Sequence, residues 1–236
     1  MVHATKKNEN FKHFINRQKT SSISNYCDFI SMYHDEGPSA PVYKRRAIIL
    51  NSIYNHSADN TINCWSNLSF DLISHLLNNN FDSIQTFHCS LGCQAITLFR
   101  KTIPLNLANS DNINDLKYLI ERVLRSFVNG RNEQCVSCFR NSRISNGQLS
   151  DTFLCFSSIF TCPLDRVPEN IETNDYTYDL VGVVEFTSNH YKAFLRLSNG
   201  EWELRDDMRD GNAVQIISKS SLSTLGVNVS LLLYVR

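Results

Sequence analysis

The chain has 236 residues, 42% hydrophobic and 11% aromatic, enough to bury a sizeable core in one large domain or two small ones. Its 23 basic and 23 acidic side chains give a formal net charge of zero, which argues against a general attraction to nucleic acid or to an anionic membrane. No apolar run is long enough to span a bilayer and the N-terminus lacks a secretory apolar region, so we expect a soluble, intracellular protein.

The first 25 or so residues are polar and basic, and we expect residues 1–40 to form a loosely ordered tail ahead of a domain over residues 41–236. From residue 64 to about 128 the pattern favours helices. The stretch 111–128 predicts an amphipathic helix with Gly130 just past its end. Its apolar stripe consists of Ile113, Leu116, Leu119, Ile120, Val123, Leu124 and Phe127. Between the helices, residues 85–107 are predicted to be extended chain around a turn.

After residue 150 the pattern changes to short β-branched and aromatic runs separated by turn residues, which predicts strands. These runs are residues 152–160, 179–186, 191–197, 201–206, 213–217 and 229–236. Asn199-Gly200 predicts a hairpin with a two-residue turn, in which position 193 pairs with position 206. The outline is a helical half and a mostly antiparallel sheet half, with a site expected in the cleft between them.

Cys64 lies at the start of a predicted helix and is followed by Trp65. A thiol at a helix N-terminus feels the positive end of the helix dipole, which favours the nucleophilic thiolate. The same residue could instead be a buried thiol that packs beside Trp65. The side-chain amides of Asn60 and Asn63 could donate to an oxyanion, or they could be turn residues and helix caps.

His190 lies between two predicted strands, and the hairpin that follows it returns two acids, Asp206 and Asp207. In the simple register Asp206 lies across from Ala193, so a bulge or bend is needed to bring it to His190. An acid that orients the imidazole is what a Cys–His nucleophile requires. Asp207 points to the opposite face and could hold a water or a backbone amide.

Two cysteine pairs stand between these regions, Cys89-x3-Cys93 and Cys135-x2-Cys138. Each pair can form a tight knuckle, and together they offer four thiolate ligands to a tetrahedral zinc ion. His88 adjoins Cys89 and could replace one thiolate. The alternative is a cluster of reduced cysteines in a reducing compartment.

Cysteine, histidine and aspartate in this order, with cysteine pairs between the first two, resemble the ubiquitin-specific peptidases, a family of papain-like cysteine isopeptidases. The resemblance covers residues 50–236, and the cysteine pairs fall where that family's zinc-binding fingers insert, near residues 85–140. The residues that fit its cysteine box and histidine box are Cys64, Trp65, Asn67, His190, Tyr191, Phe194, Trp202 and Asp206.

The resemblance implies an α+β, papain-like fold in which a helical thumb carries the cysteine, an antiparallel palm carries the histidine and aspartate, and zinc-ribbon fingers are inserted. It implies a thiol-dependent isopeptidase that cleaves ubiquitin or SUMO from protein lysines, with a structural zinc and no organic cofactor. Its expected partners are ubiquitin or SUMO conjugates, without nucleic acid or membrane, and a monomer is expected in the cytoplasm or nucleus. The residues implied are Cys64, His190, Asp206 and Asp207 for catalysis, Asn60 or Asn63 for the oxyanion, and Cys89, Cys93, Cys135 and Cys138 for the metal.

The chain also departs from the family pattern. Asp59 stands where the oxyanion asparagine normally lies, Thr61-Ile62-Asn63 replaces Gly-Asn-Thr, and Asn189 replaces the glycine before the histidine. The Cys-Trp pair, the Asn189-His190 pair, the Asp206-Asp207 ending and the compact length look closer to the divergent SUMO-specific branch. The altered cysteine box leaves open a catalytically silent relative that keeps the fold and binds ubiquitin or SUMO. A zinc-ribbon nucleic-acid binder would need a basic surface, which the neutral balance does not provide.

Overall fold

The computed structural model describes residues 9, 12–13, 32–33, 35–37, 39–54, 83–100, 102–105, 107, 115–130, 132–135, 137–187, 190–206 and 214–236. The chain divides into two compact units, Met1–Asn80 and Phe81–Arg236. In the first unit, helix α4 spans Ala40–Tyr54, with Pro41 in its first turn, where a missing N–H is tolerated. Within these described ranges, none of the helices has the length and apolar character needed to cross a membrane.

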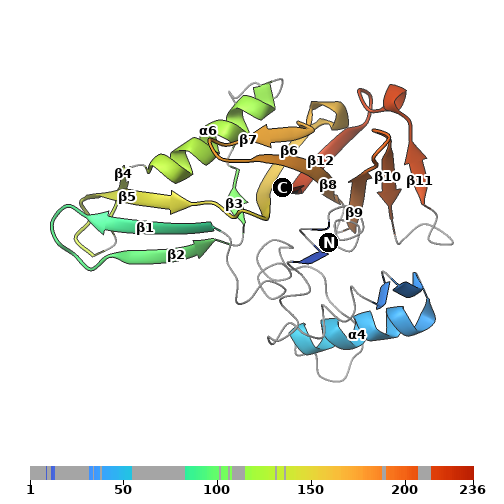
Figure 1. Cartoon of the computed structure of the whole chain (residues 1–236), viewed down its shortest axis with the longest axis horizontal. Helices are drawn as coiled ribbons and strands as arrows, with labels where there is room; N and C mark the ends of the chain where they lie inside the picture. The colour runs from blue at the N-terminus through green and yellow to red at the C-terminus, as the bar shows by residue number, and fades with distance from the viewer. Residues whose placement is uncertain are drawn as a thin grey trace. The chain divides into compact units, whose positions relative to one another are not determined.

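The second unit contains a four-stranded antiparallel sheet (Figure 1). Both cysteine pairs lie at the end of a strand of this sheet or in the loops between its strands. Its strand order is β2-β1-β5-β4, with β1 at Ser83–Cys89, β2 at Ile96–Arg100, β4 at Asn132–Gln134 and β5 at Asn141–Gln148. Strands β1 and β2 form the predicted extended chain around a turn. Strand β5 was not predicted, because its sequence NSRISNGQ lacks apolar alternation.

An eight-stranded sheet forms most of the rest of this unit, in the order β11-β10-β9-β8-β12-β6-β3, with β7 paired to β8. Every pairing is antiparallel except that of β3 with β6. The strands predicted after residue 150 are confirmed, whereas β3 and β7 were not predicted. The bounds are β3 Ile103–Pro104, β6 Phe153–Pro163, β7 Asn170–Glu172, β8 Thr177–Thr187, β9 His190–Arg196, β10 Trp202–Arg205, β11 Gln215–Ile217 and β12 Gly226–Val235. Two short 3-10 helices, Leu164–Arg166 and Lys219–Ser221, complete the element order.

Helix α6, Leu116–Asn129, confirms the amphipathic helix predicted in this region, and residues 111–114 lie outside the described part of the chain. Its buried stripe comprises Leu116, Leu119, Ile120, Leu124 and Phe127. All of these side chains except Leu119 join the core formed with the inner face of the eight-stranded sheet, including Phe156, Tyr178 and Tyr234. Each fully buried side chain of this size contributes about 1.5–3 kcal/mol, so the stripe fixes the helix to the sheet.

Gly147 on β5 lies directly against the backbone of α6. A Cβ atom at this position would lie 2.0 Å from the carbonyl oxygen of Phe127 and 2.8 Å from its carbonyl carbon. Real Cβ atoms do not approach backbone this closely, so glycine is required for the helix to contact the strand. This contact joins α6 to the sheet that carries the cysteines.

Candidate functional site

His190 and Asp206 meet at one end of the eight-stranded sheet. His190 is the first residue of β9, and Asp206 follows the last residue of β10. His190 Nε2 and Asp206 Oδ1 lie 2.6 Å apart, and the two side chains are 17% and 7% exposed. A contact this short, shielded from solvent, is a strong hydrogen bond when one or both groups are charged. The carboxylate can therefore fix the orientation of the imidazole.

The turn between β9 and β10 has three residues, 198–200, and the predicted two-residue turn is wrong. The Leu197 N–H donates to the Glu201 carbonyl at 2.8 Å, and the Gly200 N–H donates to the Leu197 carbonyl at 3.0 Å. Gly200 has φ 79°, so the loop is a type I turn followed by a left-handed glycine. The Asn199 side chain accepts a hydrogen bond from the Glu201 N–H at 3.0 Å, which stabilises this loop.

The longer turn shifts the register of the hairpin by one residue. Arg205, not Asp206, pairs with Ala193. Continuing this register by one residue places Asp206 opposite Lys192, which shares a strand face with His190. Asp206 is thus a diagonal neighbour of His190 on the same face, and the bulge or bend that the predicted register required is not needed.

The other residues predicted for catalysis cannot be placed in this site. Cys64, Asn60, Asn63 and Asp207 all lie outside the described residues. The structure therefore describes the predicted imidazole and its acid, and the roles of the nucleophile and the oxyanion donors stay predictions.

An ion pair between a buried carboxylate and a partly exposed lysine, which the sequence analysis missed, lies beside this pair of residues. Glu185 on β8 is 6% exposed, and its Oε2 lies 3.4 Å from Lys192 Nζ. Its Oε1 accepts a hydrogen bond from the Asn228 N–H at 3.1 Å. Lys192 therefore links the buried carboxylate of Glu185 to the sheet face that carries His190. The signal in the sequence was Glu185, the one acid within the apolar stretch 180–186, because a charge that a strand turns inward needs a partner.

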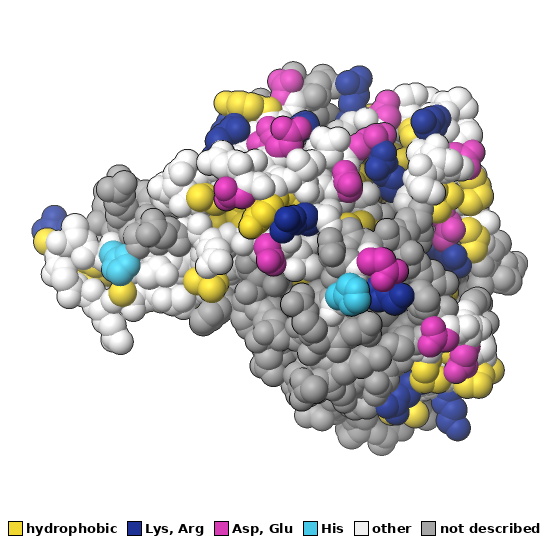
Figure 2. All heavy atoms as spheres, in the orientation of Figure 1, with side chains coloured by type: hydrophobic (Ala, Val, Ile, Leu, Met, Phe, Trp, Pro, Cys, Tyr) yellow, Lys and Arg dark blue, Asp and Glu magenta, His cyan; other side chains and the backbone are white. Residues whose placement is uncertain are grey.

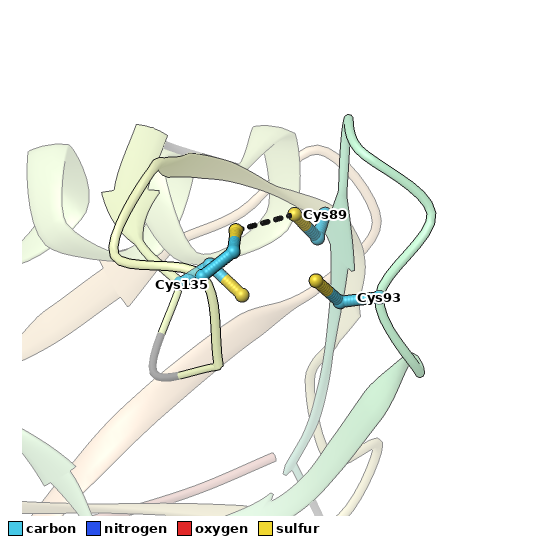
Figure 3. Close-up of side chains that lie close together, drawn as sticks. Cys89, Cys93 and Cys135 are labelled. Atoms are coloured by element: carbon cyan, nitrogen blue, oxygen red, sulfur yellow. Dashed lines mark hydrogen bonds between the residues drawn. The ribbon is translucent and has the colours of Figure 1, made fainter.

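The four predicted metal ligands come together at the tips of two hairpins (Figure 3). Cys89 ends β1 and Cys93 follows in the β1–β2 loop, while Cys135 and Cys138 lie in the β4–β5 loop. Their sulfur atoms all lie within 4.8 Å of one another, and those of Cys89 and Cys138 are 3.4 Å apart. Thiolates bound to a tetrahedral zinc at about 2.3 Å are about 3.8 Å from one another. The cluster therefore fits a zinc ion in size and in ligand chemistry.

Backbone amides favour the ionised form of one of these thiols. The pKa of Cys135 is lowered from 9.0 to about 6, chiefly because backbone N–H groups of Cys138 and Ser137 point at its sulfur. The pKa of Cys93 is raised to about 12, chiefly by hydrogen bonds with Cys138 and Cys89. Metal ligands bind as thiolates, so the donated N–H groups prepare the cluster for a cation. His88 is exposed and does not belong to this group, so the four cysteines would supply all the ligands of a bound metal ion.

A pocket of about 580 Å³ lies apart from both of these sites. It is bounded by the second half of α6 and by residues 147–151 and 172–176. Neither the His190–Asp206 pair nor the cysteines line it. Its charged side chains are of both signs, Arg125 against Asp151, Glu172 and Asp175, and they indicate no particular ligand.

No family model and no curated protein matches the chain. Among solved structures, a yeast SAGA DUB module with an Sgf73 mutant matches at 16% identity and a TM-score of 0.50, covering 100% of this chain and 64% of the other. A SAGA Ubp8/Sgf11/Sus1/Sgf73 DUB module matches at 17% identity and a TM-score of 0.49, with the same coverage. The PAN2 pseudoubiquitin-hydrolase-RNase module of Saccharomyces cerevisiae matches at 12% identity and a TM-score of 0.48, covering 100% of this chain and 48% of the other.

These likenesses concern the fold alone. The chain has a mixed α+β fold similar to that of a yeast SAGA DUB module, in agreement with the α+β fold that the resemblance in its sequence motifs implied. It spans less than two thirds of the length of each chain matched. The helical thumb and the closeness to the SUMO-specific branch stay predictions.

Proposed function

We propose that the chain is a thiol-dependent isopeptidase that cleaves ubiquitin or a ubiquitin-like modifier such as SUMO from protein lysines. The observation that carries the proposal is the 2.6 Å contact between His190 Nε2 and Asp206 Oδ1. An imidazole held by a shielded carboxylate is suited to take a proton from a thiol. The fold, similar to that of a yeast SAGA DUB module, and the four-cysteine cluster in an inserted sheet support the same proposal.

In this proposal Cys64 is the nucleophile and His190 is the base. With Nε2 held by Asp206, Nδ1 is the nitrogen that exchanges a proton with the thiol. Sγ of Cys64 attacks the carbonyl carbon of the modifier's C-terminal glycine as its proton passes to His190. The bond to the lysine nitrogen then breaks, the amine leaves with the proton from His190, and a thioester remains. Water, deprotonated by His190, then attacks the thioester carbonyl carbon. The bond to Sγ breaks, the sulfur of Cys64 takes the proton back from His190, and the modifier is released with a free carboxylate.

The remaining predicted residues have supporting roles in this scheme. The side chain of Asn60 or Asn63, together with the backbone N–H of Cys64, would donate to the oxyanion of the tetrahedral intermediate. Asp207 would support Asp206. A zinc ion bound by the four cysteines would hold the two hairpin tips together and take no part in the chemistry.

The test is covalent labelling of the purified chain by ubiquitin and SUMO that carry an electrophile at the C-terminus, followed by mass-spectrometric mapping of the modified cysteine. We expect one probe to label Cys64 and the Cys64→Ala variant to remain unlabelled. Cys155 and Cys162 serve as internal controls, because they are 3% and 1% exposed and burial raises the pKa of both thiols. Labelling at any cysteine other than Cys64 would contradict the mechanism.

The catalytically silent relative is the second candidate, because Asp59 occupies the position where the family has its oxyanion asparagine. A folded protein that binds ubiquitin or SUMO without being labelled by either probe would replace the isopeptidase with a binding module. Labelling by one probe alone would also identify the modifier.

A further inference from the structure

The end of the four-stranded sheet that holds the cysteines also exposes large apolar side chains. Leu91 in the β1–β2 loop is 64% exposed, and Phe139 in the β4–β5 loop is 74% exposed. The cysteine cluster brings these two loops together, so both side chains lie at one end of the sheet. We call Leu91, Phe139 and the exposed side chains of His88 and Arg140 the fingertip.

Phe139 has a backbone conformation that does not suit phenylalanine. Its φ is 58°, and it is the one non-glycine residue with a positive φ in the described part of the chain. The fold requires this conformation, because the Phe139 N–H donates to the Cys135 carbonyl at 2.8 Å and its carbonyl accepts from Gln134 Nε2 at 3.1 Å. Glycine would make both backbone bonds with less strain.

The exposed ring gains little from burial that could offset this strain. Folding alone would therefore favour glycine at position 139. A residue that is unfavourable for folding and that displays a large apolar side chain is typical of a binding site, where strain is retained because the side chain contacts a partner.

The charges around Phe139 indicate the chemistry of that partner. Residues 86–97 and 134–140 include Arg140 and no acidic residue. Among the described side chains at this end of the molecule, Figure 2 shows yellow, dark-blue and cyan ones and no magenta. A partner with carboxylates around an apolar side chain would match this surface. A nucleic acid would need several cations for its phosphates, and these two segments provide one.

We propose that the fingertip is a docking surface for an acidic protein segment with an aromatic or aliphatic anchor, in which Phe139 and Leu91 contact the anchor and Arg140 pairs with the flanking carboxylates. Strand β5, with eight residues, separates this surface by about 26 Å from the junction of the sheet with α6. A segment of this kind can therefore dock whether or not the chain is a peptidase.

The first test is a selection of random displayed peptides on the full chain, with counter-selection on the Phe139→Gly variant. We expect enrichment of peptides that carry Phe, Trp or Leu flanked by Asp and Glu. A synthetic peptide of the enriched sequence should bind roughly tenfold or more weakly to Phe139→Gly and several-fold more weakly to Arg140→Gln. Tyr118→Ala is the matched control, because Tyr118 is an aromatic residue on α6 that is 56% exposed, and it should leave binding unchanged.

A thermal unfolding scan of the same variants separates binding from structure. If Phe139 serves binding, Phe139→Gly loses the peptide and keeps or raises its unfolding temperature, because the left-handed strain is relieved. Phe139→Ala keeps the backbone strain, so it should lose peptide binding without a rise in unfolding temperature. A fall in unfolding temperature for Phe139→Gly would assign the ring a structural role and overturn the proposal. Enriched peptides without acidic residues, equal binding to Phe139→Gly, or salt-sensitive binding of an oligonucleotide would also overturn it.

Discussion

Replacing Asp206 by asparagine tests whether the carboxylate acts through His190. The change keeps the size of the side chain and removes a negative charge 2.6 Å from Nε2. The two side chains are 17% and 7% exposed, so the interaction is not screened as a surface pair would be. A hydrogen bond to a charged group contributes about 1.5–3 kcal/mol. Since each 1.4 kcal/mol is about a factor of ten in rate, we expect Asp206→Asn to slow the reaction of Cys64 by roughly ten- to a hundred-fold.

The assay is the rate at which the ubiquitin or SUMO probe that labels the chain modifies Cys64. Asp179→Asn is the matched control, because Asp179 is an exposed acid on β8, and it should leave the rate unchanged. In a His190→Gln background, Asp206→Asn should cause no further loss, because the acid would have no imidazole to act on. A slowing of less than about threefold, or equal slowing with and without His190, would refute the role given to Asp206.

Three further predictions concern the architecture. Gly147→Ala should lower the free energy of unfolding by about 2–3 kcal/mol, because a Cβ 2.0 Å from the Phe127 carbonyl oxygen forces α6 away from β5. The control Gly226→Ala, whose Cβ would have nothing within 4 Å, should change this free energy by less than about 0.5 kcal/mol. Equal effects of the two substitutions in urea unfolding would contradict the prediction. Cys138→Ser should lower the zinc content measured by atomic absorption and speed hydrogen exchange of the β1 and β5 amides, and unchanged exchange would show that the cluster does not hold the hairpins. Burial raises the pKa of Cys155 from 9.0 to about 12, so above pH 9 the unfolded chain loses a proton that the folded chain keeps. The free energy of unfolding should therefore fall as the pH rises from about 9 toward 12, with Cys155 unreactive to iodoacetamide in the folded protein at pH 9; labelling there would contradict the burial.

The elements that were predictable from the sequence are those whose burial follows a simple period. Helix α6 places one stripe in the core, and the strands after residue 150 alternate or run apolar because the sheet has an inner face. Strand β5 follows no such period. It belongs to the sheet because it pairs with β1 and β4 and because Gly147 admits α6, and these are non-local conditions that a local pattern does not carry.

The cysteine cluster was the predictable part of the candidate sites. Each pair of cysteines is close in sequence, so a short loop is enough to bring its two sulfur atoms together. Only the meeting of the two knuckles depends on the fold, through the pairing of β1 with β5. The ion pair of Glu185 and Lys192 could not be predicted in this way, because the two residues meet across neighbouring strands and neither occupies a recognisable motif.

The position of Asp206 shows how one residue of loop length controls a site. A two-residue turn at Asn199-Gly200 would need a positive φ at both residues, and of these two only Gly200 has one. Asn199 instead uses its side chain to accept the Glu201 N–H, and the turn takes three residues. Side chains alternate between faces along a strand, so a two-residue turn would place Asp206 on the face opposite His190. The length of the loop decides which face of the sheet Asp206 lies on, and the three-residue loop puts it on the face of His190. The Asn-Gly dipeptide alone does not determine this length.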